Sequence, residues 1–176
     1  MKNYFLSGFL LICLSGCNAL DELTKFDMDY NTEVVIESSF GVNLPFNVFT
    51  PEIESNSESE FAINDTRKDL IEEIQLKELS LRITAPQEED FSFLESVEIF
   101  ITAEGLEEVL IASMTDVPQD IGDLLELDTS NADIQEYIKK DRFQLRLNTV
   151  TDEAIAVDHY IDVNAIFFVD AKILGI

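Results

Sequence analysis

The sequence lacks tryptophan and has only one histidine, two cysteines and 11 basic residues among its 176 residues. Against these stand 36 acidic residues, which leaves a formal net charge of −25. Nucleic acids and anionic lipid surfaces bind through basic patches, so this balance excludes both as partners. The hydrophobic content of 46%, with 13 phenylalanines, is still enough to build a core. The length suits one domain.

Long apolar runs are missing too. Residues 4–14 are mostly apolar, but eleven residues cannot cross a bilayer as a helix, which takes about 20. This run follows Lys2 and precedes the small residues Ser15 and Gly16, which is the layout of a secretory signal. We therefore expect residues 1–16 to be a signal peptide and the chain to contain no transmembrane helix.

The end of this leader, Leu14-Ser15-Gly16-Cys17, resembles the lipobox of bacterial lipoproteins. The resemblance implies that the Cys17 thiol receives a diacylglyceryl group, that a peptidase cuts before Cys17, and that the new amine is acylated. Several acyl chains would anchor the protein stably in a membrane. Cys13 would leave with the leader, so the mature chain could form no internal disulfide. An ordinary secreted protein with a chance cysteine at this position is the alternative.

Residues 17–25 would then be a short lipidated tether, followed by a single domain over residues 26–176. Asn18 after the lipidated cysteine implies, by the same resemblance, the outer membrane, on either its periplasmic or its surface face. Asp21 and Glu22 resemble the surface-export signals of some lipoproteins. The implied location is the cell envelope.

The mature sequence is dominated by apolar residues at every second position, the pattern of half-buried strands. About eight strands are predicted: 26–36, 44–50, 80–85, 97–101, 109–114, 124–127, 143–147 and 157–167. The apolar positions change phase between Leu76 and Leu79, which indicates a bulge or a short helix there.

Other segments lead to more specific expectations. Residues 52–60 are poor in apolar residues and predict a mobile loop, whereas residues 109–114 and 166–169 predict strands buried on both faces. Residues 130–140 predict one short amphipathic helix, with Ser130 as its N-cap. The strands at 143–147 and 157–167 are expected to form a hairpin. The pattern favours an all-β fold, an immunoglobulin-like antiparallel β-sandwich.

The sequence offers no catalytic constellation. His159 has no recognisable nucleophile or acid partner and is expected to be a partly buried structural residue. One histidine and no free cysteine disfavour zinc, so we predict neither a metal site nor a cofactor. Calcium, which takes oxygen ligands, is the alternative. The acids considered for it are Asp27, Asp29, Glu88, Glu89, Asp90, Asp116, Asp120 and Asp123.

These observations predict a membrane-anchored extracytoplasmic lipoprotein that is not an enzyme. It would act as a binding or structural module, joined to membrane lipid through Cys17, with a cell-envelope protein or glycan as its partner. A calcium-dependent adhesion module and a small carbohydrate-active enzyme with paired carboxylates remain as alternatives.

Overall fold

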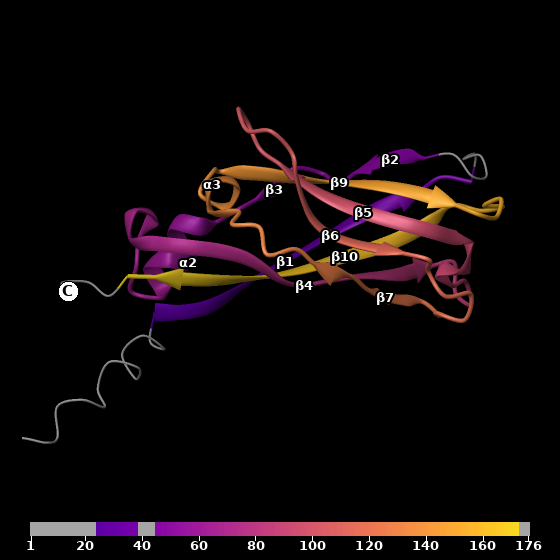
Figure 1. Cartoon of the computed structure of the whole chain (residues 1–176), viewed down its shortest axis with the longest axis horizontal. Helices are drawn as coiled ribbons and strands as arrows, with labels where there is room; N and C mark the ends of the chain where they lie inside the picture. Colours follow the sequence, from indigo (N-terminus) through magenta and orange to yellow (C-terminus); the bar gives the residue numbers. More distant parts are fainter. Residues whose placement is uncertain (1–23, 39–44, 173–176) are drawn as a thin grey trace, which may run out of the picture.

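Two antiparallel sheets pack face to face in the computed structural model, which describes residues 24–38 and 45–172 (Figure 1). One sheet has four strands in the order β1-β10-β4-β7. Their bounds are β1 Lys25–Ile36, β10 His159–Ala171, β4 Ile71–Ala85 and β7 Leu124–Glu126. The predicted two-sheet β-sandwich is therefore confirmed.

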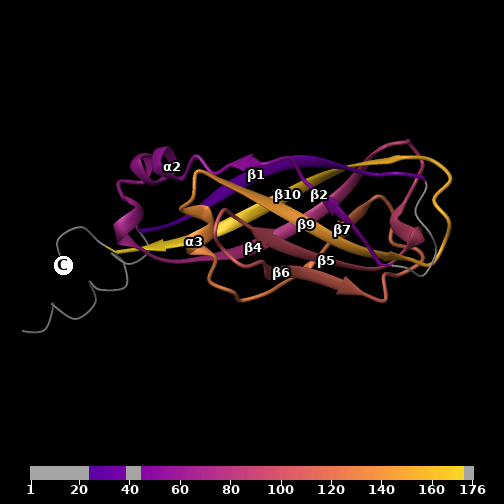
Figure 2. The same cartoon turned by 90° about the horizontal axis from the view of Figure 1, so that it is seen from above.

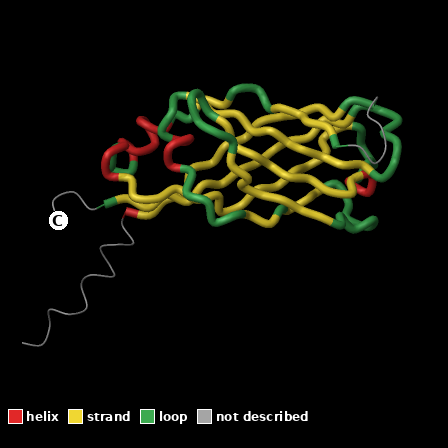
Figure 3. Tube along the Cα trace, turned by 45° about the horizontal axis from the view of Figure 1, so that its top comes forward, coloured by secondary structure: helices red, strands yellow, loops and turns green. Residues whose placement is uncertain are grey.

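The second sheet has six strands, in the order β2-β9-β5-β6-β8, with β3 pairing with β9. Their bounds are β2 Phe46–Phe49, β9 Arg142–Thr151, β5 Leu94–Thr102, β6 Val109–Thr115, β8 Asp128–Thr129 and β3 Ile53–Glu54. The helical segments are α2 Ser57–Ile63, α3 Gln135–Ile138 and the 3-10 turns η2 Lys68–Leu70 and η3 Phe91–Phe93. They lie at the two ends of the elongated strand body (Figure 3).

The strand pairing is nested: β1 pairs with β10, β2 with β9, β4 with β7, and β5 with β6. An antiparallel ribbon that folds over onto itself gives this order. The immunoglobulin arrangement instead keeps its last two strands in one sheet. Here β9 and β10 lie in opposite sheets, so both the immunoglobulin-like strand order and the hairpin expected between them are wrong.

The core lies between the sheets and follows the predicted alternation. Every second residue of β10, from His159 to Ala171, is buried, as are Phe143, Leu145 and Leu147 of β9. The alternate residues Ile166 and Phe168 are half-buried rather than covered, because they face outward between polar neighbours such as Asp29 and Gln75. The prediction that both faces of this segment are buried is thus wrong.

Two bulges account for irregular hydrophobic patterns. In β4, Glu78 pairs with Ile166 and Leu76 with Phe167, which leaves Lys77 as the extra residue and confirms the predicted bulge. In β6, a shift beside Ile99 makes the adjacent residues Ile111 and Ala112 both buried. The prediction that both faces of this strand are buried is therefore wrong. One face is buried and contains a bulge, while Leu110 on the other face is exposed.

Residues 52–60 are not the expected loop. They contain β3 and the start of α2, and both Ser55 and Ser57 are buried. The Ser55 amide donates to the Asp141 carbonyl at 3.0 Å and its hydroxyl to the Lys140 carbonyl at 2.5 Å. Its own carbonyl accepts from the Tyr30 hydroxyl, whose pKa is raised by burial and by nearby Glu60. Long-range bonds thus order a segment of low hydrophobicity.

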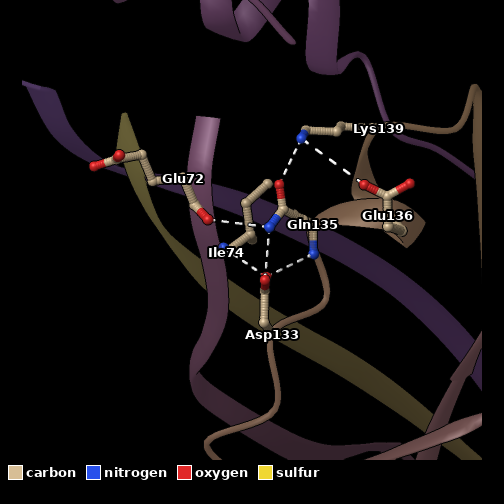
Figure 4. A network of polar contacts seen from close by, with 6 residues as sticks. All are labelled: Glu72, Ile74, Asp133, Gln135, Glu136 and Lys139. Atoms are coloured by element: carbon tan, nitrogen blue, oxygen red, sulfur yellow. Dashed lines mark hydrogen bonds and ion pairs between the residues drawn. The ribbon is translucent and has the colours of Figure 1, made fainter. Parts of the chain in front are cut away.

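The helix expected over residues 130–140 is shorter and begins later. Ser130 bonds to the β6 backbone instead, and the N-cap residue of α3 is Ile134, which makes no side-chain cap hydrogen bond. Asp133 Oδ1 accepts from the amides of Gln135 at 3.1 Å and Ile74 at 3.2 Å (Figure 4). The Gln135 side chain donates to the Glu72 carbonyl at 3.0 Å. These bonds fix α3 to the end of β4.

Replacing Asp133 with Ala should lower the free energy of unfolding by about 1 kcal/mol, because it removes the hydrogen bonds that Asp133 Oδ1 accepts from the amides of Ile74 and Gln135. Urea unfolding measures the change. Glu136→Ala is the control, because the Glu136 carboxylate is exposed and contacts this network only through an ion pair of 3.9 Å with Lys139 Nζ. An equal loss in both variants would contradict the role of Asp133 in joining α3 to β4.

The two ends of the sandwich differ in their connections. β1 begins where β10 ends, because Lys25 pairs with Asp170, and α2 and α3 lie at this same end (Figure 2). The β4–β5, β6–β7 and β9–β10 connections lie at the other end (Figure 1). The 13 residues of β10 separate the two ends by roughly 40 Å.

Candidate functional site

The outer faces of the two sheets differ in charge. The strands of the four-stranded sheet carry nine acidic residues, none of them buried: Asp27, Asp29, Glu33, Glu72, Glu73, Glu78, Glu126, Asp162 and Asp170. On the four main strands of the other sheet (β2, β9, β5 and β6), the acidic residues are Glu98, which faces outward, and Glu95, which is exposed at the bulge near the start of β5. Glu54 of β3 and Asp128 of β8 add acids at its margins. The outer face of the six-stranded sheet is therefore much less acidic than that of the four-stranded sheet, in a chain of charge −25. The centres of protein interfaces are likewise depleted in charged residues.

A row of four side chains crosses this face. Strand register places Phe49 of β2 beside Arg146 of β9, Arg146 beside Phe100 of β5, and Phe100 beside Leu110 of β6. Phe49 is 53% exposed and Leu110 is 37% exposed. Aromatic residues and arginine are the types most enriched in binding surfaces. We call these four residues the cross-sheet row.

Arg146 is held rigidly at the centre of the cross-sheet row. Its Nε and Nη2 donate to the two carboxylate oxygens of Glu108 at 2.8 and 2.7 Å, and Nη1 donates to Asn47 Oδ1 at 2.5 Å. Its guanidinium carbon lies 4.2 Å from the centre of the Phe100 ring. A bidentate pair together with cation–π stacking fixes the side chain in one orientation.

Polar side chains form a second row beside the first. Asn47, Asn148 and Glu98 are neighbours on β2, β9 and β5, and Asn148 Nδ2 donates to Glu98 Oε2 at 2.9 Å. The bond from Arg146 uses Asn47 Oδ1, and the bond to Glu98 uses Asn148 Nδ2, so neither bond uses Asn47 Nδ2 or Asn148 Oδ1. The face therefore offers a donor and an acceptor next to exposed apolar groups.

The end of the sandwich far from Lys25 is acidic. Three connections at this end, residues 86–93, 116–123 and 152–158, contain nine acidic residues and no lysine or arginine. Gln119 joins them by donating to the Ser92 carbonyl and to Asp152, both at 3.0 Å. Hydrogen bonds from Ser92 lower the pKa of Asp90, and the backbone of Ser38 does the same for Asp158.

The acids considered for calcium are spread over different places. Asp27 lies on β1 and bonds to Lys77 at 2.6 Å, while Asp29 is its outward neighbour. Glu88, Glu89 and Asp90 lie in the β4–β5 connection, and Asp123 of the β6–β7 connection pairs with Arg82 at 3.1 Å. Within residues 24–38 and 45–172, no three acidic, histidine or cysteine side chains group closely enough to hold a metal ion.

His159 is buried, with an exposure of 3%. Its Nδ1 lies 3.0 Å from the Val157 carbonyl and its ring packs 4.7 Å from that of Phe93. Nε2 has no hydrogen-bond partner and lies 3.6 Å from Glu89. These contacts place His159 in the wall of the core, between the β4–β5 connection and the start of β10.

Cys17, the predicted lipidation site, lies outside the described residues. The described part of the chain has no helix long and apolar enough to span a membrane. The cross-sheet row was not anticipated from the sequence. Its one sequence signal is β9, where the outward residues Arg142, Gln144, Arg146, Asn148 and Val150 include no acid in an otherwise acidic chain.

Comparisons with known proteins give no family for this chain. No family model matches it, and no curated protein matches it. Among solved structures, a chain of Desmodium yellow mottle tymovirus is similar to it at 9% sequence identity and a TM-score of 0.25. That similarity covers 86% of this chain and 91% of the viral one. A score this low carries no argument about function.

Proposed function

We propose that this chain is a lipid-anchored lipoprotein of the cell envelope whose sandwich is a binding module rather than an enzyme. The contrast between the two outer faces carries the proposal. The acidic face keeps the domain soluble, while the less acidic face presents the cross-sheet row to a partner. The nested strand order favours the jelly-roll class of sandwich over the immunoglobulin class.

Anchoring is supported by the leader and by the place where the domain begins. The lipobox-like residues end at Cys17, and β1 begins at Lys25. The intervening residues reach about 26 Å when extended, so the domain would stay close to its membrane. Asn18 supports the outer membrane. Lys25 lies at the end opposite the acidic connections, so the proposed tether directs those connections away from the bilayer.

The form of the candidate face favours binding over catalysis. Catalytic groups usually converge in a cleft that excludes water. Here Arg146 donates to both Glu108 and Asn47 on an open sheet face. Such an arrangement presents a fixed surface and holds its charged groups in mutual pairs.

Mass spectrometry of the protein from the membrane fraction tests the anchor. We expect a mature chain that starts at Cys17 and carries acyl chains on the thiol and the amine. Cys17→Ser should move the protein out of the membrane fraction or leave it unprocessed, whereas Cys13→Ser, a change inside the leader, should leave the mature product unaltered. A mature chain that begins at another residue would contradict the proposal.

A further inference from the structure

We propose that the outer face of the six-stranded sheet binds an uncharged glycan that lies along the cross-sheet row. This inference rests on the proposed binding function and specifies its ligand. It starts from four side chains that four different strands bring into one line: Phe49, Arg146, Phe100 and Leu110.

Charge argues for an uncharged ligand. Arg146, the charged residue of the cross-sheet row, is already paired with Glu108, and Glu98 in the neighbouring row accepts a hydrogen bond from Asn148. An anionic ligand would approach a protein of charge −25, and a cationic one would find far more acid on the opposite face. A neutral ligand incurs neither electrostatic cost, so it is the kind that this face would favour.

The size of the face argues against a second protein. The strands β2, β9, β5 and β6 present two, five, four and three outward residues in register. With strands about 4.8 Å apart and outward residues about 6.8 Å apart along each strand, they cover roughly 450 Å². A stable protein interface covers about 800 Å² on each partner. A second copy of this chain would also bring another highly acidic surface close to the first. A narrow, chain-like ligand fits the area better.

The side chains match the two kinds of surface that a sugar presents. The exposed ring of Phe49 and the Leu110 side chain can pack against the apolar C–H face of a sugar ring. Asn47 Nδ2 can donate to a hydroxyl group and Asn148 Oδ1 can accept from one. Because the bonds of Arg146 and Glu98 already fix these amides, little side-chain freedom is lost on binding.

An array that carries both uncharged and acidic glycans tests the proposal, with the full protein purified in detergent as the probe. We expect binding to uncharged glycans and none to acidic ones. Phe49→Ser should weaken binding at least about tenfold. Tyr160→Ser is the matched control, since Tyr160 is an aromatic residue of 42% exposure on the opposite outer face, and it should leave binding unchanged. Thermal unfolding confirms that both variants fold.

Three results would overturn the inference. They are an array on which no uncharged glycan binds, binding that survives Phe49→Ser, and binding that both variants lose equally. Sedimentation that shows a dimer dissociated by Phe49→Ser would assign the face to self-association instead. An acylated Cys17 together with a negative array would leave the anchored binding module standing and refute only its glycan ligand.

Discussion

Leu145→Asp and Val163→Asp should each unfold the domain. The two side chains are 1% exposed, and they point into the same core from opposite sheets, Leu145 from β9 and Val163 from β10. A buried carboxylate without a partner costs several kcal/mol, against a total stability of about 5–15 kcal/mol for a domain. Loss of the far-UV circular dichroism signal of the folded state measures the outcome.

The control for this experiment is Asn164→Asp, which places the same carboxylate on the outward side of β10 beside Val163. It should leave the domain folded. Nearly neutral effects at both Leu145 and Val163 would mean that the inward and outward faces of these strands are assigned the wrong way round.

Phe167→Ala should reduce the free energy of unfolding by about 3–5 kcal/mol. Phe167 is fully buried where three rings meet edge to face. Its centroid lies 5.4 Å from Tyr30 of β1 and 6.0 Å from Phe143 of β9, so the cluster joins the two sheets. Removing the ring leaves a cavity that neither sheet can close alone. Urea unfolding gives the magnitude.

Phe168→Ala provides the comparison for that measurement. Phe168 is the next residue along β10 but faces outward and is only half-buried. Its loss should therefore cost clearly less than the loss of Phe167. If the two variants lost the same stability, the ring cluster could not be the main link between the sheets.

The period of two in the sequence predicted which residues of most strands face the core, because alternation depends only on local geometry. Leu145 and Val163 are examples, and the β4 bulge was likewise visible as a change of phase. Pairing could not be predicted in the same way. Seven residues, 152–158, separate β9 from β10, and such a connection serves a hairpin or a crossing between sheets equally well.

Segments ordered by distant contacts were the ones predicted wrongly. Residues 52–60 have the composition of a loop, yet Ser55 is fixed by Lys140, Asp141 and Tyr30, which lie far from it in sequence. Ser130 was a plausible helix cap by type, but it bonds to β6, and the helix begins after Ile134 instead. Composition cannot reveal such partners.

The candidate face could not be found from the sequence for a related reason. Phe49, Phe100, Leu110 and Arg146 are separated by up to about a hundred residues and become neighbours only through the register of four strands. Each of them, taken singly, is an ordinary outward residue of a strand. The absence of acids along β9 was the only local sign.

Photo-crosslinking in intact cells tests the binding module most directly. A photoreactive phenylalanine analogue at position 49 keeps the aromatic ring in the cross-sheet row, and the same analogue at position 160 places it on the acidic outer face. The account predicts a crosslinked product with a component of the cell envelope from position 49 and none from position 160. No product from either position, or the same product from both, would contradict it.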